Sequence, residues 1–168
     1  MTLYLATDHT GFELKNKLKV FLQKEGYLVE DCGAYAYNKD DDYPDFITRA
    51  AQMVSKDPDN SKGIIFGGSG QGEAMLANKY KGVRCALFYA PAIPVKPVNI
   101  KGRESTDPFE ILKLSREHNW ANMLSIGVRF LKEDEILKAI KIWLESPAPT
   151  DQNHIRRVEK IRKIEETI

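Results

Sequence analysis

The chain is poor in the features that mark secreted, membrane and metal-dependent proteins. Two cysteines are too few for a disulfide framework, and the three histidines match no metal-binding spacing; they are Cys32, Cys85, His9, His118 and His154. No apolar run approaches the ~20 residues that cross a membrane. The first residues also lack the basic start of a signal peptide. We therefore expect a reduced, cytoplasmic chain with no metal and no contact with a membrane.

The sequence also lacks a strong charge of either sign. It has 25 Lys and Arg against 24 Asp and Glu, a formal net charge of +1. Proteins that bind nucleic acid nonspecifically carry a clear basic excess, so a nucleic-acid partner is not expected. The length of 168 residues, with 42% hydrophobic and 29% charged residues, is typical of one globular domain.

The most informative stretch runs from Gly67 to Glu73. A short apolar segment, 63–66, precedes it and predicts a buried strand, and Ala74–Tyr80 predicts a helix after it. Four glycines, at positions 67, 68, 70 and 72, leave the main-chain amides open to a ligand. Amides at a strand-to-helix turn bind anions, either a phosphate or a developing enolate.

Glu73 distinguishes between these two kinds of anion. A carboxylate beside an anion site hinders phosphate binding, but it suits the removal of a proton from carbon next to a stabilised oxyanion. The alternative is a plain tight turn with an acidic residue favoured by the helix dipole. The dipole lowers the pKa of a carboxyl group, so burial must outweigh it for a base that works near neutral pH.

Strand and helix patterns alternate along the chain. Strands are predicted at 3–7, 27–32, 63–66, 83–89 and 123–127, and helices at 12–24, 44–56, 74–80, 109–117, 133–145 and 151–168. Such alternation predicts a three-layer α/β/α sandwich with a five-stranded parallel, Rossmann-like sheet. We expect one α/β domain over residues 1–150, with a long proline-rich loop at 91–107. The helix at 151–168 is not expected to form a separate domain.

Polar residues follow several strands at the edge where parallel sheets bind ligands. Asp8 and His9 follow the first strand, Ser69–Glu73 the third, and Arg129 the fifth. His118 and Asn119 precede the fifth strand and need the helix before them to bring them in. Each has a plainer interpretation: Asp8 as a helix cap, His118 as a C-terminal helix residue, and the arginines as surface charge.

Several motifs together resemble the type B ribose-5-phosphate isomerases, a family that includes galactose-6-phosphate isomerase subunits. They are Ala6-Thr7-Asp8-His9-Thr10-Gly11-Phe12-Glu13-Leu14-Lys15, Asp42-Tyr43-Pro44, Gly67–Glu73 with Ala77-Asn78-Lys79, and Arg116-Glu117-His118-Asn119. The resemblance covers nearly the whole chain except 91–107. It implies a metal-free and cofactor-free aldose–ketose isomerase that acts through a cis-enediolate, with ribose 5-phosphate and ribulose 5-phosphate as the leading pair.

The resemblance also implies roles for single residues. In one branch of the family the base is a cysteine just before the turn, where this chain has Gly67. In the other branch a glutamate of the turn is the base, and Glu73 matches it. The remaining matches are Ser69, Gly68, Gly70, Gly72 and Asn119 around the enediolate, Asp8 and His118 in ring opening, Tyr43 on the substrate, and His9, Arg129, His154 and Arg157 on the phosphate. In the family the phosphate-binding residues come together across a homodimer interface, where the C-terminal segment reaches the neighbouring subunit. The resemblance therefore implies a homodimer, with a tetramer as the alternative.

Two features depart from the family pattern. Asn153 stands where relatives often have arginine, so one phosphate contact is expected to be missing. The 91–107 loop, which carries Lys96, Lys101 and Arg103, leaves the preferred substrate open because it could reshape the pocket. We hypothesise that this loop lies over the site and returns a positive charge; the alternative is a disordered or subunit-packing insertion. The rival functions are isomerisation of a six-carbon phosphosugar, of the galactose 6-phosphate or allose 6-phosphate type, and non-catalytic binding of a phosphosugar.

Overall fold

The computed structural model describes residues 1–167 and contains the expected sheet. Its strands are β1 (Thr2–Thr7), β2 (Leu28–Asp31), β3 (Ser61–Gly67), β4 (Cys85–Phe88) and β5 (Met123–Gly127). All neighbouring strands are parallel, in the order β2-β1-β3-β5-β4. The prediction of a five-stranded parallel sheet in an α/β fold is confirmed.

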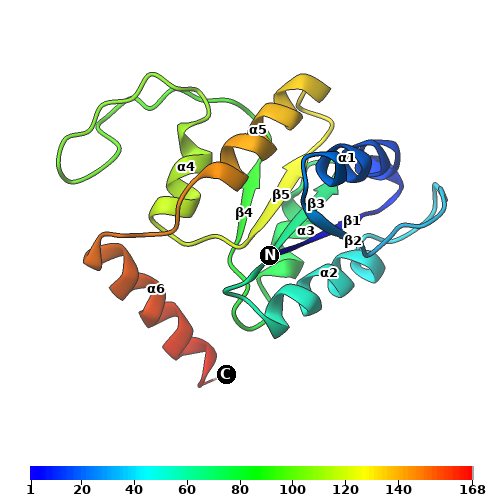
Figure 1. The fold of residues 1–168 in the computed structure, drawn as a ribbon, viewed down its shortest axis with the longest axis horizontal. Coiled ribbons are helices and arrows are strands. Elements are labelled where there is room, and N and C mark those ends of the chain that lie inside the picture. The colour runs from blue at the N-terminus through cyan, green and yellow to red at the C-terminus, as the bar shows by residue number, and fades with distance from the viewer. Residues whose placement is uncertain (168) are drawn as a thin grey trace.

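Helices cover both faces of the sheet (Figure 1). They are α1 (Phe12–Lys24), α2 (Pro44–Lys56), α3 (Gln71–Ala77), α4 (Glu110–Glu117), α5 (Glu133–Glu145) and α6 (Gln152–Glu165), with a short 3-10 turn at His9–Gly11 before α1. Side chains of α1, α4 and α5 pack in one hydrophobic cluster, and those of α2 and α3 in another. The sheet therefore lies between two helical layers.

Alternation along the strands explains the two layers. In β1, Leu3 and Leu5 belong to the first cluster, whereas Tyr4 and Ala6 belong to the second. All four side chains are buried. Successive side chains of a strand point to opposite faces, so a strand that is apolar at every position must be covered on both sides. The continuous apolar run at 3–6 therefore corresponds to a strand that helices cover on both faces.

Some boundaries differ from the sequence patterns. The helix predicted at 74–80 is α3, which begins earlier, at Gln71, and ends at Ala77. Gly70 caps it with φ of +74°, a conformation that glycine adopts at little cost, so helical geometry starts directly after Gly70 and includes Gly72. The strand predicted at 83–89 pairs only over Cys85–Phe88, β1, β2 and β3 differ from their predicted bounds by one or two residues, and β5 has the predicted bounds.

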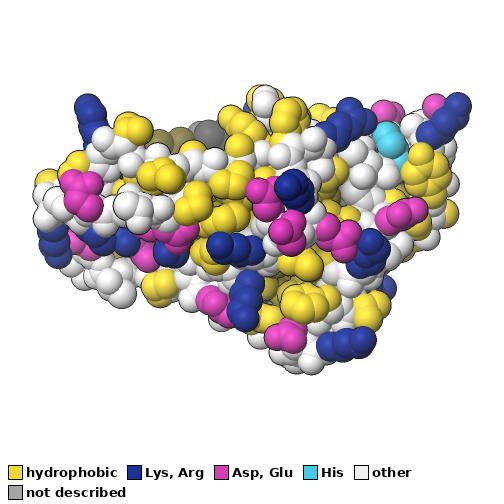
Figure 2. All heavy atoms as spheres, turned by 90° about the horizontal axis from the view of Figure 1, so that it is seen from above, with side chains coloured by type: hydrophobic (Ala, Val, Ile, Leu, Met, Phe, Trp, Pro, Cys, Tyr) yellow, Lys and Arg dark blue, Asp and Glu magenta, His cyan; other side chains and the backbone are white. Residues whose placement is uncertain are grey.

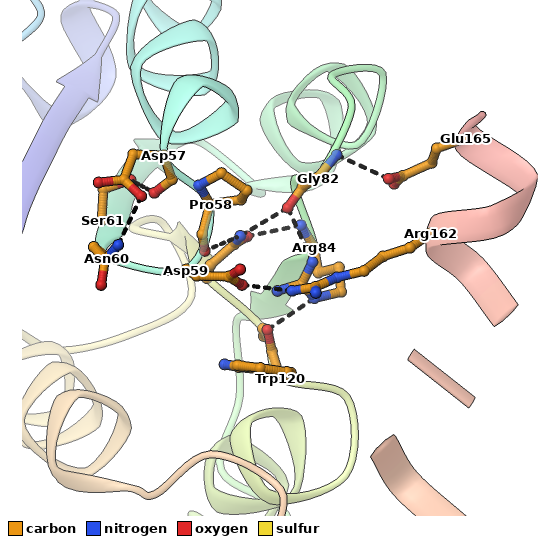
Figure 3. Close-up of polar contacts among 12 residues, drawn as sticks. Asp57, Pro58, Asp59, Asn60, Ser61, Gly82, Arg84, Trp120, Arg162 and Glu165 are labelled. Atoms are coloured by element: carbon orange, nitrogen blue, oxygen red, sulfur yellow. Dashed lines mark hydrogen bonds and ion pairs between the residues drawn. The ribbon is translucent and has the colours of Figure 1, made fainter. Parts of the chain in front are cut away.

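The C-terminal helix lies beside the layers rather than within them (Figure 1). Its far end is fastened to the chain's own body, as Figure 3 shows. The Arg162 guanidinium is 2.5 Å from the Asp59 carboxylate and the Gly82 amide donates to Glu165. Val158 is buried. Whether α6 also packs on a neighbouring subunit, as the sequence leads us to expect, stays a prediction.

In the described part of the chain no helix has the length and apolarity that crossing a membrane requires. The face in Figure 2 carries Lys and Arg side chains interspersed with Asp and Glu, with no broad region of one sign. This distribution agrees with the balanced composition.

Candidate active site

The site lies at the point in the sheet where the chain reverses its direction of strand addition. The chain goes from β1 outward to β2, then returns to place β3 on the other side of β1. Ligands of open α/β sheets bind beyond the carboxyl ends of the strands at such a point. A cavity of about 300 Å³ is found there, lined by Asp8, His9, Thr10, Tyr43, Gly68, Ser69, Gly72, Glu73 and Arg129. The structure thus brings together the residues predicted after three separate strands.

Glu73 is buried in this cavity, with 5% of its surface exposed. Burial raises the pKa of its carboxyl group, the nearby Asp8 carboxylate raises it further, and the backbone amide of Glu73 itself acts in the opposite direction. No lysine or arginine in the described residues forms an ion pair with it. Burial therefore outweighs the backbone hydrogen bond, and the raised pKa makes this carboxylate a stronger base than an exposed glutamate.

The glycine-rich turn presents free amides beside Glu73. The Gly70 carbonyl accepts a hydrogen bond from Ser125 Oγ at 2.6 Å, and the Gln71 amide donates to Ser69 Oγ at 3.3 Å. Within residues 1–167 the amides of Gly68, Ser69 and Gly70 donate to no protein acceptor. Unpaired amides next to a cavity can donate to the oxygen of a ligand.

Tyr43 and Arg129 lie on two sides of the turn, in space that is free because Gly72 and Gly68 have no side chains. A Cβ atom at position 72 would lie 2.8 Å from the Tyr43 hydroxyl, and one at position 68 would lie 3.2 Å from the Arg129 guanidinium carbon. The Arg129 amide donates to the Gly68 carbonyl at 3.1 Å. The glycines therefore allow a phenol and a guanidinium to approach the main chain that they flank.

Asp8 caps a helical turn and also faces the cavity. Its Oδ1 accepts from the Thr10 amide at 2.8 Å and so caps the 3-10 turn, and its side chain also lines the cavity. His9 is held by Asp41, whose Oδ1 accepts from the His9 amide at 3.0 Å and lies 2.7 Å from His9 Nδ1.

Asp41 is a partner that the sequence reasoning missed. It belongs to the acidic run 40–42, which gave no sign of which carboxylate faces inward. Ligand atoms of Asp8, His9 and Asp41 lie within 4.8 Å of one another, a set that could hold a cation. The hydrogen bonds between His9 and Asp41 account for this arrangement by themselves.

The other predicted residues lie away from the Glu73 cavity in the same chain. His118 and His154 stack with ring centroids 3.9 Å apart, and Arg157 Nη1 is 3.4 Å from His154 Nδ1. Both histidines line a cavity of about 330 Å³, and Asn119 lines another. None of the four lines the Glu73 cavity. Within one chain, the helix before β5 does not bring His118 and Asn119 to the base.

Burial lowers the pKa of His118, and the stacked His154 lowers it further. Neither free cysteine resembles a nucleophile. Burial raises the pKa of Cys32 to about 11 and raises that of Cys85 as well. Thiols of this kind stay protonated and are weak nucleophiles.

The chain matches a known protein family over most of its length. The model of the Ribose/Galactose Isomerase family matches residues 3–94 and 105–161. The chain is 38% identical to ribose-5-phosphate isomerase B of Mycolicibacterium paratuberculosis, over 99% of this chain and 93% of the relative. It is 36% identical to the protein of that name from Mycobacterium tuberculosis, over 99% of this chain and 91% of the relative.

Solved structures resemble the whole fold. Ribose-5-phosphate isomerase B of Mycoplasma genitalium, with bound ribulose 5-phosphate, superimposes with a TM-score of 0.85 at 31% identity, covering 99% of this chain and 97% of that one. The type B enzyme of Trypanosoma cruzi gives a TM-score of 0.82 at 29% identity and covers all of both chains.

Proposed function

Because this chain belongs to the Ribose/Galactose Isomerase family, we propose that it interconverts ribose 5-phosphate and ribulose 5-phosphate, with Glu73 as the base. The observation that carries the role of Glu73 is its position: a buried carboxylate, free of any ion pair in the described chain, beside amides that have no protein acceptor. A hydrogen next to a carbonyl is only weakly acidic, so its removal needs a base and an oxyanion site together.

The chemistry moves one proton between neighbouring carbons. Glu73 takes the hydrogen from C2 of the open-chain aldose and the electron pair forms the enediolate, whose oxygen lies against the Ser69 hydroxyl and the amides of 68–72. Glu73 then returns the proton to C1 while a proton moves from O2 to O1, so that the carbonyl forms at C2 and the product is the ketose. Asp8 and His118 assist ring opening. His9, Arg129, His154 and Arg157 bind the phosphate, which is remote from the reacting bond and orients the sugar.

We propose further that two copies of the chain share each site. One cavity holds the proposed base beside the open amides, whereas the other is lined by the stacked imidazoles, with Arg157 against His154, and not by Glu73. Neither set of residues is sufficient for this reaction by itself. A homodimer in which the second group of one subunit meets the first group of its partner would complete two identical sites, as twofold symmetry requires. Association of dimers to a tetramer stays an open expectation.

The experiment that tests the function is incubation in deuterated water with a panel of pentose and hexose phosphates. Isomerisation of ribose 5-phosphate with deuterium entering the exchanging carbon supports the proposal. The family description also includes galactose, so a preference for a six-carbon phosphosugar is the main competing outcome. Binding without isomerisation of any sugar would make the chain a non-catalytic module. The reaction needs no cofactor or metal, and a cytoplasmic location remains our prediction.

A further inference from the structure

The loop between β4 and α4 contains the part of the chain that the family model leaves out. The match stops at residue 94 and resumes at 105. This segment forms the long loop that extends from the sheet (Figure 1). Its base is closed by a hydrogen bond from the Ala92 amide to the Pro108 carbonyl at 2.8 Å. At its tip, Asn99 Oδ1 accepts from the amides of Lys101 and Arg103, each at 3.0 Å. The tip is a hydrogen-bonded turn with a defined shape.

Arg103 fastens this turn to α4. Its Nη2 lies 2.8 Å from Glu110 Oε1 and 3.1 Å from Glu117 Oε2, and Glu110 is buried. Ser105 Oγ donates to the other oxygen of Glu110 at 2.9 Å. A guanidinium held by two carboxylates has a structural role, and no residue of the loop lines the Glu73 cavity. The expectation that Arg103 offers its charge to the phosphate, from a loop over that cavity, is therefore wrong for the single chain.

The fastened turn places Lys101 at a different cavity. Asn99, Ile100 and Lys101 line the same 330 Å³ space as His118 and His154. The ammonium of Lys101 is 3.8 Å from the Asp151 carboxylate, and its side chain is 79% exposed. An exposed pair at this distance contributes at most about 1 kcal/mol. The ammonium can therefore turn to a stronger anion at little cost.

The groups around Lys101 suit an anion. Asp151 accepts from the Asn153 amide at 2.8 Å as the cap of α6, which already engages its charge. The two imidazoles line the cavity, and Arg157 lies against one of them, with Nη1 3.4 Å from His154 Nδ1. Glu117 also lines the cavity, but its carboxylate is paired with Arg103. A lysine and an arginine beside imidazole donors from different elements form the kind of group that binds phosphate.

We propose that Lys101, which lies outside the stretch that the family model matches, is a substrate-binding residue that places its ammonium on the phosphate of the sugar held by His154 and Arg157. This inference rests on the proposed function, since it takes the phosphate to be that of the isomerised sugar. The phosphate is remote from the bond that changes, so its contact with Lys101 is equally strong before and during the reaction. Such a contact lowers KM and leaves kcat unaltered.

The test compares Lys101→Ala with Lys96→Ala, a change of the same type in the same loop at an exposed position that does not line the cavity. Lys101→Ala should raise KM for ribose 5-phosphate roughly tenfold or more, the equivalent of one charge-assisted hydrogen bond. Its kcat and melting temperature should stay at wild-type values. Lys96→Ala should leave both kinetic constants unchanged, and Lys101→Arg should retain most of the affinity.

Calorimetric titration with inorganic phosphate, in excess over the protein, separates this inference from the proposed reaction because it needs no turnover. Weaker binding of phosphate to Lys101→Ala than to Lys96→Ala supports the assignment even if no sugar is isomerised. Equal KM values and equal phosphate affinities for the two variants would overturn it, as would a wild-type protein that binds no phosphate. A fall in kcat alone would also refute it, because it would mean that Lys101 acts on the chemical step.

Discussion

The carboxylate of Glu73 fills the space that a side chain at position 67 would need. A Cβ atom at Gly67 would overlap both oxygens and the carboxyl carbon of Glu73. The family resemblance implies that one branch has a cysteine as base at the position of Gly67. The proposed base Glu73 would therefore reach the same place beside the turn as that cysteine, and each would exclude the other. Glycine at 67 is a requirement of glutamate at 73.

This overlap predicts a strong coupling between the two positions. Gly67→Ala should lower the free energy of unfolding by about 1–3 kcal/mol, as overpacking of a buried site does, and should abolish activity by displacing the carboxylate. In a Glu73→Ala background the same change should cost almost nothing, since the space is vacant. Urea unfolding of the four proteins in a double-mutant cycle measures the coupling. Equal costs in both backgrounds would contradict the overlap.

The raised pKa of Glu73 predicts the acid side of the pH profile. The base must be ionised, so kcat/KM should fall as the pH drops through the raised pKa of Glu73, above the value of about 4.3 for an exposed glutamate. Glu73→Gln should reduce kcat by at least ~100-fold. A midpoint at or below that of an exposed glutamate would argue against the role.

The raised pKa of Glu73 also affects stability: ionisation of this carboxyl group favours activity but disfavours the folded state. Between the unfolded and the folded pKa of Glu73 the native state binds more protons than the unfolded state, so stability falls as the pH rises through this range. Ionised and buried, Glu73 therefore destabilises the fold at neutral pH. Glu73→Gln should be inactive and yet more resistant to urea at pH 7, but no more resistant near pH 4. An inactive variant that is also less stable at pH 7 would indicate a structural role instead.

The sequence was sufficient for the part of the site that the sheet itself assembles. Asp8, Glu73 and Arg129 follow the carboxyl ends of β1, β3 and β5, and parallel strands bring such ends together whatever the details of packing. Tyr43 joins them because α2 begins directly after it, at Pro44. The positions of strands and the starts of helices are local features, and hydrophobic periodicity indicates them well.

The rest depends on contacts between distant side chains. The stacking of His118 on His154 follows from the way α6 meets the end of α4, which no periodicity specifies. Asp41 is one of three consecutive aspartates that the sequence does not distinguish, and only the path of the loop brings its carboxylate to His9. Arg103 was expected to be free because its carboxylate partners lie on α4, outside the loop that carries it.

The division of site residues between two cavities predicts that inactive variants can complement each other. In a heterodimer of Glu73→Gln and His118→Asn, one shared site carries both changes and the other carries neither. Purified heterodimer, isolated through two different tags after coexpression, should therefore show about half of wild-type activity. Pairing Glu73→Gln with Ser69→Ala, which belongs to the same cavity, should restore nothing. Equal activities for the two heterodimers would refute the shared site.

Lys62 provides a prediction about stability that does not involve the site. Its side chain is buried, its ammonium donates to the Leu144 carbonyl at 3.3 Å, and it lies 5.4 Å from the centre of the Trp143 ring. Burial, and then the positive charge of Arg116, lower the pKa of Lys62 to about 8. An unfolded lysine titrates near 10.4, and each unit of difference corresponds to about 1.4 kcal/mol.

The sign of the effect follows from proton binding. Between about pH 8 and 10 the unfolded chain keeps a proton on Lys62 that the folded protein has released, so the contribution of this group to stability rises with pH. At pH 7 the buried charge destabilises the fold. Lys62→Met should therefore raise the free energy of unfolding at pH 7 by about 1–3 kcal/mol, because an apolar side chain of similar length removes a buried charge.

Urea unfolding at pH 7 and at pH 9.5 measures this gain, which should shrink at the higher pH. Lys56→Met, at an exposed position, should leave stability unchanged at both. If Lys62→Met were less stable than wild type at pH 7, the bond to Leu144 and the contact with Trp143 would outweigh the cost of burying the ammonium. The pKa of Lys62 would then lie closer to that of an exposed lysine.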